Sequence, residues 1–292
     1  MSPGEPSRLR NLVGPRRLLV GAGLGLFFAG LYVLRADPRE LLPNREGLRV
    51  AGEFLRAALH PALDYEASDL PASAPAFGVK VGAALAVTLR YAVVAMSLAL
   101  AGGIVFGFLG SRAWWPDRPG PFFGFLLEAV RVVVRTVATA ARSVHELLWA
   151  LLFLTAVGTS PLAAVLAIAL PYSGVLGKVF AELLDEQNDS AARVMRAAGS
   201  GSFAAFLAGV LIRGLPDLVT YAFYRFECAV RSSAILGFLG IPTLGYHLAT
   251  AYEDGHYREI WTYLYVLIVA VAVIDQWGAL VRKRMSRPRP SR

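Results

Sequence analysis

The sequence predicts an all-α protein, a polytopic transmembrane helical bundle with about six spans. Hydrophobic residues make up 56% of the 292 residues, and the mean hydropathy of +0.52 is high for a globular protein. Several apolar runs reach the roughly 20 residues that a helix needs to cross a bilayer. Arginines gather beside these runs, where they report topology and meet anionic headgroups. Together these observations indicate an integral membrane protein.

The predicted spans follow the apolar runs in chain order. They lie at about 18–34, 81–109, 135–157, 161–180, 205–227 and 261–281. The first span follows Arg16 and Arg17 and has no small-residue cleavage site before Arg35, so we expect an anchor rather than a signal peptide. Trp261 and Trp277 bracket the last span, as rings at two headgroup levels would do.

The third predicted span is unusually polar where it begins. Arg135 and Arg142 fall in its first half, which a lipid-facing helix would disfavour. Only the short segment 158–161 separates it from the fourth span, which leaves room for a tight turn and nothing more. A re-entrant hairpin is the alternative interpretation of this region.

Basic flanks predict how the chain is oriented. Residues 1–17 and 282–292 are rich in arginine, so both termini are expected in the cytoplasm, which requires an even number of spans. The loop at 181–204 also carries arginines and falls on the cytoplasmic side of this topology. Residues 81–281 then form the membrane core.

The loop at 35–80 is extracytoplasmic in the same topology. Within it, Arg45, Arg49 and Glu53 recur at helical spacing opposite Leu48, the pattern of an amphipathic helix at the membrane interface. The acidic and proline-rich stretch that follows predicts an extended connection.

Several chemistries are not expected from this sequence. Cys228 is the only cysteine, which excludes an intramolecular disulfide framework. No G-x-x-x-x-G-K-[ST] loop occurs, so the chain itself is not expected to bind or hydrolyse ATP. His247 and His256 match no metal-binding spacing, and we expect neither a metal site nor catalytic residues. The net charge of +8 is attributed to topology and lipid headgroups, not to nucleic-acid binding.

Ionisable residues inside predicted spans are the main candidates for function. Arg142 and Glu146 are four residues apart, so a continuous helix would put them on one face at ion-pair distance, with Trp149 about one turn further. Asp275, near the end of the last span, is expected to pair with Arg282.

Two further sets of charged residues lie close to the ends of predicted spans. The first joins Lys178 with Glu182, and the second joins Arg225 with Glu227 and Arg231. Snorkelling to the membrane interface is the structural alternative to a functional role for such charges.

Two glycine pairs have the spacing that lets helices approach closely. Gly103 and Gly107 lie in the second predicted span, and Gly21 and Gly25 lie in the first. Each pair follows the small-xxx-small pattern, so we expect helix packing at both.

Three strings carry a resemblance to a known family. They read R-S-x-x-E-L-x-W-A-L-L-F from Arg142, L-G-K-x-F-A-E from Leu176 and Y-R-F-E-x-x-V-R-S from Tyr224. The chain from Gly78 to Arg284 resembles the membrane-spanning permease of phosphonate-type ABC importers. The resemblance implies the type I, MetI-like permease fold and a place in the bacterial cytoplasmic (inner) membrane.

The resemblance also implies partners and a transport role. A second permease chain, identical or related, would complete the pathway for a phosphorus oxyanion, with phosphonate expected first and phosphite or phosphate behind it. A solute-binding protein would deliver the ion, and a dimer of ABC ATPase subunits would use ATP and Mg²⁺ to drive transport. The residues open to a role along the pathway are Arg142, Glu146, Trp149, Lys178, Arg225, Glu227 and Arg231.

Permeases of this class carry a cytoplasmic E-A-A-x-x-x-G loop that docks on the ATPase. In the matching segment Gly199 takes the glycine position, Val194 takes the first alanine position, and Arg193 stands in place of the glutamate. The implied coupling residues are Arg193, Val194, Arg196, Ala197, Ala198, Gly199 and Ser200.

Other positions depart from the family pattern. Ile212 replaces a proline after the coupling loop, and Pro242 stiffens a turn that is glycine-rich in relatives. His145 stands where the family has proline, so its helix is expected to be straighter than in relatives. An ion-coupled secondary transporter using Glu146 or Asp275, and a non-transporting scaffold, are the alternatives from other functional classes.

Overall fold

The computed structural model describes residues 15–34, 44–67, 71, 73–116, 120–158 and 160–285, and every regular element in these ranges is a helix. The chain divides into two compact units, Met1–Arg56 and Ala57–Arg292. Residues 1–14 of the predicted terminal segment 1–17, residues 286–292 of the predicted segment 282–292, and residues 35–43, 68–70 and 72 of the predicted loop at 35–80 lie outside the described residues.

The first unit contains α1 (Pro15–Val33) and most of α2 (Arg45–Leu59). The first residues of α2 are held by Asn44, whose Oδ1 accepts a hydrogen bond from the Gly47 N–H at 2.6 Å. Helix α2 forms where the sequence predicts an amphipathic helix, and its place at a membrane interface stays a prediction. The predicted helix packing at Gly21 and Gly25 of α1 stays a prediction.

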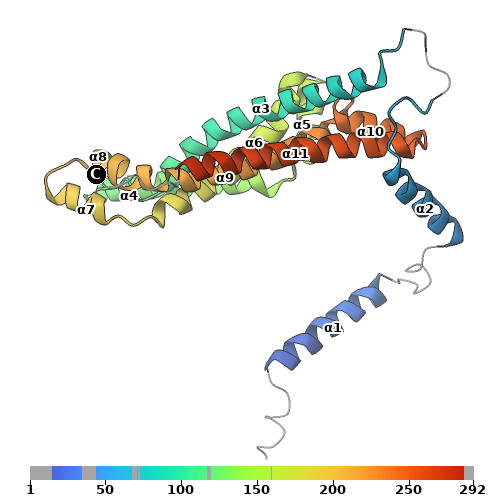
Figure 1. The fold of residues 1–292 in the computed structure, drawn as a ribbon. Coiled ribbons are helices and arrows are strands. Elements are labelled where there is room, and N and C mark those ends of the chain that lie inside the picture. Colours follow the sequence, from blue (N-terminus) through green and yellow to red (C-terminus); the bar gives the residue numbers. More distant parts are fainter. Residues whose placement is uncertain are drawn as a thin grey trace, which may run out of the picture. The chain divides into compact units, whose positions relative to one another are not determined.

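The second unit is a bundle built on four long helical segments. Its elements are α3 (Phe77–Gly110), α4 (Pro121–Ser143), α5 (Glu146–Val157), α6 (Pro161–Asp185), α7 (Ser190–Ala197), α8 (Ser202–Phe206), the π-helix η2 (Leu207–Leu211), α9 (Ile212–Ile235), the 3₁₀ helix η3 (Leu236–Leu239), α10 (Leu244–Glu253) and α11 (Tyr257–Met285). Figure 1 shows α3, α6, α9 and α11 running along a common direction, with α7 and α8 at one end and α10 at the other.

Four helical segments of the described chain are long and apolar enough to cross a membrane: 77–110, 161–185, 202–234 and 257–285. They contain the second, fourth, fifth and sixth predicted spans. Two shorter apolar helices, Leu18–Val33 and Glu146–Val157, coincide with the first predicted span and the second half of the third. Hydropathy therefore locates each apolar segment, but it does not show that the third predicted span consists of parts of two helices.

The third predicted span, 135–157, is wrong as a single helix. Helix α4 ends at Ser143, Val144 and His145 have extended backbones, and α5 begins at Glu146. The Nδ1 atom of His145 accepts a hydrogen bond from the Leu147 N–H at 3.2 Å, so the imidazole caps the new helix. His145 thus begins a new helix and does not continue a straight one, and the comparison with the proline of relatives stays a prediction.

The turn between α5 and α6 is as tight as its sequence predicts. Gly158 has a φ of +81°, a left-handed conformation that glycine adopts without strain. The Ser160 hydroxyl then accepts a hydrogen bond from the Ala163 N–H at 3.1 Å, and Pro161 occupies the first position of α6. Because the turn is so short, α5 and α6 are neighbours in the bundle.

Helices α3 and α6 approach closely because glycines line their contact. A Cβ added at Gly103 would lie 2.5 Å from the Leu176 Cβ, and one added at Gly107 would lie 2.6 Å from the Phe180 Cβ. A Cβ at Gly177 on α6 would collide with Phe106 on α3. The predicted packing role of Gly103 and Gly107 is confirmed.

The segment that follows α2 is hydrogen-bonded to the start of α11, at the end of the bundle away from α7 (Figure 1). Oε2 of Glu66 accepts hydrogen bonds from the N–H groups of Arg258 and Glu259 at 3.0 and 3.1 Å. In return, Oε1 of Glu259 accepts a hydrogen bond from the Glu66 N–H at 2.8 Å. These bonds satisfy N–H groups that the first turn of α11 leaves unpaired. Residues 61–67 are thus irregular, as predicted, but they are tied to α11 and do not form a free connection.

We predict that Gly103→Ala destabilises the protein, because the new methyl group would overlap Leu176. Overpacking of this kind costs about 1–3 kcal/mol. A lower midpoint of thermal unfolding in detergent is the expected result. The matched control is Gly82→Ala on the same helix, where the methyl group meets nothing within 4 Å. Equal midpoints for the two variants would contradict the close-packing interpretation.

Candidate functional site

The segment matched to the coupling loop forms a short helix, α7, with a defined stop. The N–H of Gly199 donates to the Arg196 carbonyl, and the N–H of Ser200 donates to the Met195 carbonyl, each at 3.0 Å. This pair of bonds is a Schellman motif, which needs a left-handed residue after the helix. Gly199 supplies it with a φ of +92°. The backbone conformation therefore explains why residue 199 is a glycine.

One face of α7 is packed and the other is exposed. Ala192 is fully buried against η2, where a Cβ added at Gly209 would lie 2.7 Å from the Ala192 nitrogen. Val194 is 70% exposed on the opposite side. Arg193 is also exposed and pairs with Asp189 at 3.5 Å. The helix is thus held to the bundle by one side and leaves the other side open to a partner.

The predicted coupling residues all lie in α7 or in the turn that ends it. Arg193, Val194, Arg196 and Ala197 belong to the helix, Ala198 caps it, and Gly199 and Ser200 complete the Schellman motif. The structure brings them together as one element. Their contact with an ATPase stays a prediction.

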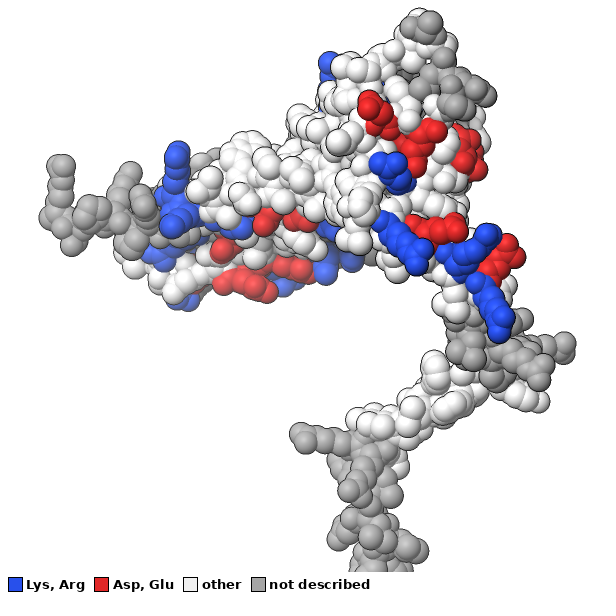
Figure 2. All heavy atoms as spheres, turned by 45° about the vertical axis from the view of Figure 1, so that its right-hand side comes forward, with Lys and Arg blue, Asp and Glu red and all other residues white. Residues whose placement is uncertain are grey.

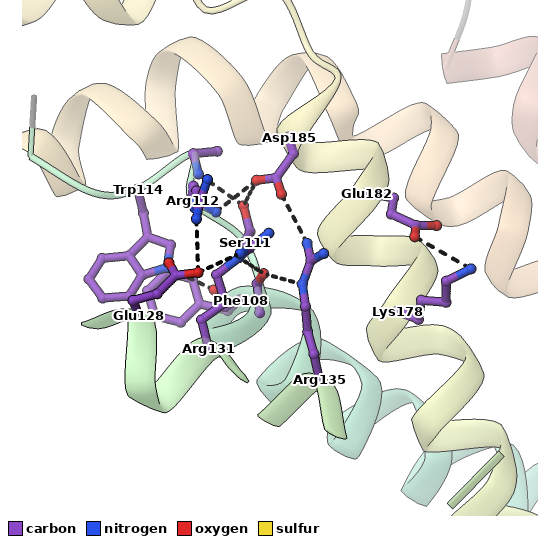
Figure 3. Close-up of polar contacts among 12 residues, drawn as sticks. Phe108, Ser111, Arg112, Trp114, Glu128, Arg131, Arg135, Lys178, Glu182 and Asp185 are labelled. Carbon is purple, nitrogen blue, oxygen red and sulfur yellow. Dashed lines mark hydrogen bonds and ion pairs between the residues drawn. The ribbon is translucent and has the colours of Figure 1, made fainter. Parts of the chain in front are cut away.

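A polar junction joins the ends of α3 and α6 to the middle of α4, just before α7. We call Gly110, Ser111, Arg112, Arg135 and Asp185 the Asp185 junction. Figure 3 shows the Asp185 carboxylate, at the end of α6, pointing toward residues of α3 and α4. Its Oδ1 accepts hydrogen bonds from the Ser111 hydroxyl and the Arg112 N–H, each at 2.7 Å. Its Oδ2 accepts one from Arg135 Nη2 at 3.1 Å.

Arginines of α4 also cap the end of α3. Arg131 and Arg135 both donate from Nε to the Gly110 carbonyl, at 3.2 and 3.0 Å. Glu128 in turn accepts hydrogen bonds from Arg112 at 2.8 Å and from Arg131 at 3.1 Å. A carbonyl that the helix end leaves unpaired thus receives charged donors.

Sequence reasoning did not find this junction. It interpreted Arg135 as the polar start of a span and Asp185 as part of a loop. Asp185 is 74 residues from Ser111, and no local pattern connects them. The only available signal was a cluster of arginines at the start of a predicted span, which needed a partner.

A second polar network lies between α5, α6 and α9. Oε1 of Glu146 accepts a hydrogen bond from the Ser232 hydroxyl at 2.7 Å. That hydroxyl lies 2.9 Å from the hydroxyl of the buried Tyr172. The Arg225 guanidinium lies over the Tyr172 ring, 4.2 Å from its centroid. Glu146 and Arg225 therefore flank one buried Tyr–Ser pair.

The predicted pairing of Arg142 with Glu146 is wrong. The helix breaks between them, so they do not share a face, and no ion pair joins these two described residues. The indole N–H of Trp149 bridges the break by donating to the Ala141 carbonyl at 3.0 Å. The Nε atoms of Arg142 and Arg225 are buried and have no hydrogen-bond partner among the described residues.

The other predicted charges pair locally and stay outside this network. Lys178 lies 3.4 Å from Glu182 on α6, and Arg231 lies 3.2 Å from Glu227 on α9. Both pairs are partly exposed and have the predicted spacing. The predicted pair of Asp275 and Arg282 is confirmed at 4.0 Å.

The cavities of the bundle differ in chemistry. One of about 670 Å³ between α3, α6 and α8 to α9 has an apolar lining that includes Phe108, Phe180 and Phe206. A cleft of about 540 Å³ between α6, α9 and α11 carries Glu227 and Asp275. Figure 2 shows acidic and basic side chains gathered along one side of the long helical body, beside a broad surface without charge.

No group of three metal-ligating side chains comes together in the parts of the chain that the structure describes. His247, considered as a ligand, is half-buried and stacks on Tyr263 with ring centroids 5.8 Å apart. Burial lowers the pKa of His247, and the positive charge of Lys80 lowers it further.

We predict that Ser232→Ala destabilises the bundle, because Tyr172 and Glu146 would both lose a buried partner. The expected cost is about 1–3 kcal/mol, seen as a lower midpoint of thermal unfolding in detergent. Ser97→Ala is the control, since that hydroxyl donates only to a carbonyl of its own helix, Val93. If both variants unfold at the wild-type midpoint, the network does not stabilise the fold.

Comparisons with known proteins place these features in context. The family described as "Binding-protein-dependent transport system inner membrane component" matches residues 120–287. A solved structure of the MetNI methionine ABC transporter in inward-facing conformations has a TM-score of 0.60 and 20% identity, covering 72% of this chain and 98% of that one. At this identity the likeness shows the fold alone.

Two curated relatives are similar over most of the chain. The phosphate-import permease protein PhnE of Mycolicibacterium smegmatis is 30% identical over 209 residues, which cover 72% of this chain and 37% of that protein. The phosphite transport system permease protein PtxC of Stutzerimonas stutzeri is 30% identical over 197 residues, covering 67% of this chain and 68% of that protein. The chain thus spans little more than a third of the first relative and about two thirds of the second.

Proposed function

We propose, because the chain belongs to the family of binding-protein-dependent transport system inner membrane components, that it is the permease subunit of an ATP-driven importer for a phosphorus oxyanion. The chain would pass the ion from a solute-binding protein across the bacterial cytoplasmic membrane. A second permease chain would complete the pathway, and a separate pair of ATPase subunits would bind ATP and Mg²⁺.

The observation that carries this proposal is α7. It is a helix of eight residues between two spanning segments, packed by Ala192 and open at Val194. A helix that is attached to the bundle by one face can receive a force on the other and pass it inward. Closure of an ATPase dimer would bias the permease between two conformations through this contact.

The orientation of the chain follows from the same assignment. An ATPase that uses cellular ATP requires α7 on the cytoplasmic side, together with the loop between α3 and α4. The six predicted spans then leave both termini in the cytoplasm, in agreement with the basic segments at 1–17 and 282–292.

The substrate assignment rests on relatives and on two arginines. The relatives are named for phosphate import and phosphite transport. Arg142 and Arg225 each present a buried Nε without a hydrogen-bond partner among the described residues, as a transient contact for an anion requires. Phosphonate, phosphite and phosphate all share the tetrahedral oxyanion that such donors recognise.

ATP-driven uptake tests the whole proposal. The chain, its cognate ATPase and its cognate solute-binding protein are reconstituted in proteoliposomes with ATP and Mg²⁺ inside the compartment that faces the ATPase. We expect uptake of phosphonate, phosphite or phosphate above that of sulfate, and no uptake without ATP. Uptake that continues without ATP but follows an ion gradient would identify a secondary transporter instead. A solute-binding protein that binds only sugars or amino acids would overturn the substrate class.

We predict that Gly199→Ala impairs coupling, because a side chain at a φ of +92° strains the end of α7. The strain is about 1–2 kcal/mol, enough to shift or fray this helix. Transport and ATPase recruitment should therefore fall together.

Gly201→Ala is the matched control for this prediction. Gly201 has an ordinary φ of −62°, and at both glycines an added Cβ meets nothing within 4 Å. Backbone strain is then the main difference between the two substitutions. Wild-type uptake and recruitment by the Gly199→Ala protein would show that α7 is not the docking element.

A further inference from the structure

We infer that Asp185 is a positioning residue that makes α7, the adjoining ends of α3 and α6, and the middle of α4 move as one body during transport. The inference rests on the proposed function, because it concerns how motion imposed on α7 reaches the spanning helices. Nothing in the resemblance assigns a role to this residue.

The first support is the short distance along the chain between the junction and α7. Asp185 is the last residue of α6, and α7 begins at Ser190, so only residues 186–189 lie between them. This link is itself held at two points. Gln187 donates from Nε2 to Asp217 of α9 at 3.2 Å, and Arg193 pairs with Asp189 at 3.5 Å. A displacement of α7 is therefore expected to pass to Asp185 almost undiminished, because the link is short and held in place.

The second support is the number of helices that meet on one carboxylate. Ser111 and Arg112 belong to the end of α3, and Arg135 belongs to α4 (Figure 3). The two oxygens of Asp185 accept three hydrogen bonds from these donors. One acidic side chain on α6 thus binds both the end of α3 and the middle of α4 directly.

The third support is that Asp185 is the specific tie to α6 at this level. Helices α3 and α4 are already joined without it, through the Gly110 carbonyl and the two arginines of α4. Further from these helix ends, the glycine contacts hold α3 to α6. Removing the Asp185 charge should therefore leave the fold intact and loosen only the last turn of α6 against its neighbours.

The environment of the junction favours a mechanical role over a role in the pathway. The Asp185 side chain is 26% exposed and that of Arg135 is 36% exposed, so both charges retain contact with water. The junction donors are already used on Asp185 or on Gly110, which leaves them poorly placed to bind a travelling ion. The hydrogen bonds of the junction instead hold the end of α6, which precedes α7, rigidly against α3 and α4.

Asp185→Asn in the complete transporter tests the inference. The variant keeps the shape of the side chain but removes the charge that Arg135 and the Arg112 N–H contact. We expect solute-binding protein and ATPase to assemble normally and ATP hydrolysis to continue. The amount of substrate moved per ATP should fall about tenfold, a loss typical of weakened coupling between two sites.

The matched control is Glu186→Gln. Glu186 is the next residue, it is exposed, and its carboxylate has no hydrogen bond or ion pair among the described residues. This substitution removes the same charge from the same segment without touching the junction. Substrate moved per ATP should stay within about twofold of wild type, since exposed charges contribute little.

A rescue variant separates positioning from simple stability. Asp185→Glu keeps a carboxylate on α6 within reach of Arg135, whose Nη2 contacts Asp185, and leaves the fully buried Ser111 unchanged. We expect it to recover much of the substrate moved per ATP that Asp185→Asn loses.

Two results would overturn the inference. One is a wild-type ratio of substrate to ATP in Asp185→Asn. The other is a loss of assembly and of thermal stability that parallels the loss of transport, because Asp185 would then be a structural residue. Failure of the proposed function is distinguishable from both, since the wild-type complex would then show no ATP-driven uptake.

Discussion

The close approach of α3 and α6 is the constraint on which the rest of the bundle depends. Gly103, Gly107 and Gly177 remove the side chains that would hold the two backbones apart. In a bilayer there is no hydrophobic drive between helices, so contact of this kind supplies the association energy. The same contact sets the axial position of α6 against α3, which brings Asp185 to Ser111 at one end.

That alignment also decides what happens in the bundle interior. With α6 fixed, Tyr172 faces Ser232 of α9, and Glu146 of α5 completes the chain of hydrogen bonds. Buried polar groups in a membrane need such internal partners because lipid offers none. The bundle thus has two polar regions. The Asp185 junction lies beside α7, and the network of Glu146, Ser232 and Tyr172 lies along the spanning segments. The packed glycines lie between them and make both possible.

The limits of the sequence interpretation follow from the range of each interaction. Apolar length located four spanning segments, and local spacing identified the packing of Gly103 and Gly107. Local spacing failed at Arg142 and Glu146, because it assumed a helix that His145 interrupts by capping α5 with its imidazole. The sequence does not predict the Asp185 junction, because Asp185 on α6 binds residues at the end of α3 and in α4 that are far away along the chain. For α7, the resemblance supplied the glycine, and the backbone conformation explained why it is glycine.

The π-helix η2 has a consequence for the phase of α9. A π turn accommodates one more residue than an α turn, and one residue corresponds to about 100° of rotation around a helix axis. Gly209 in this turn faces Ala192 of α7, while Arg225 and Ser232 downstream face the interior network. The extra residue of the π turn therefore contributes to the rotational offset between these two contacts. Loss of a single residue from 207–211 would leave every downstream side chain of α9 turned by about a quarter of a revolution relative to α7.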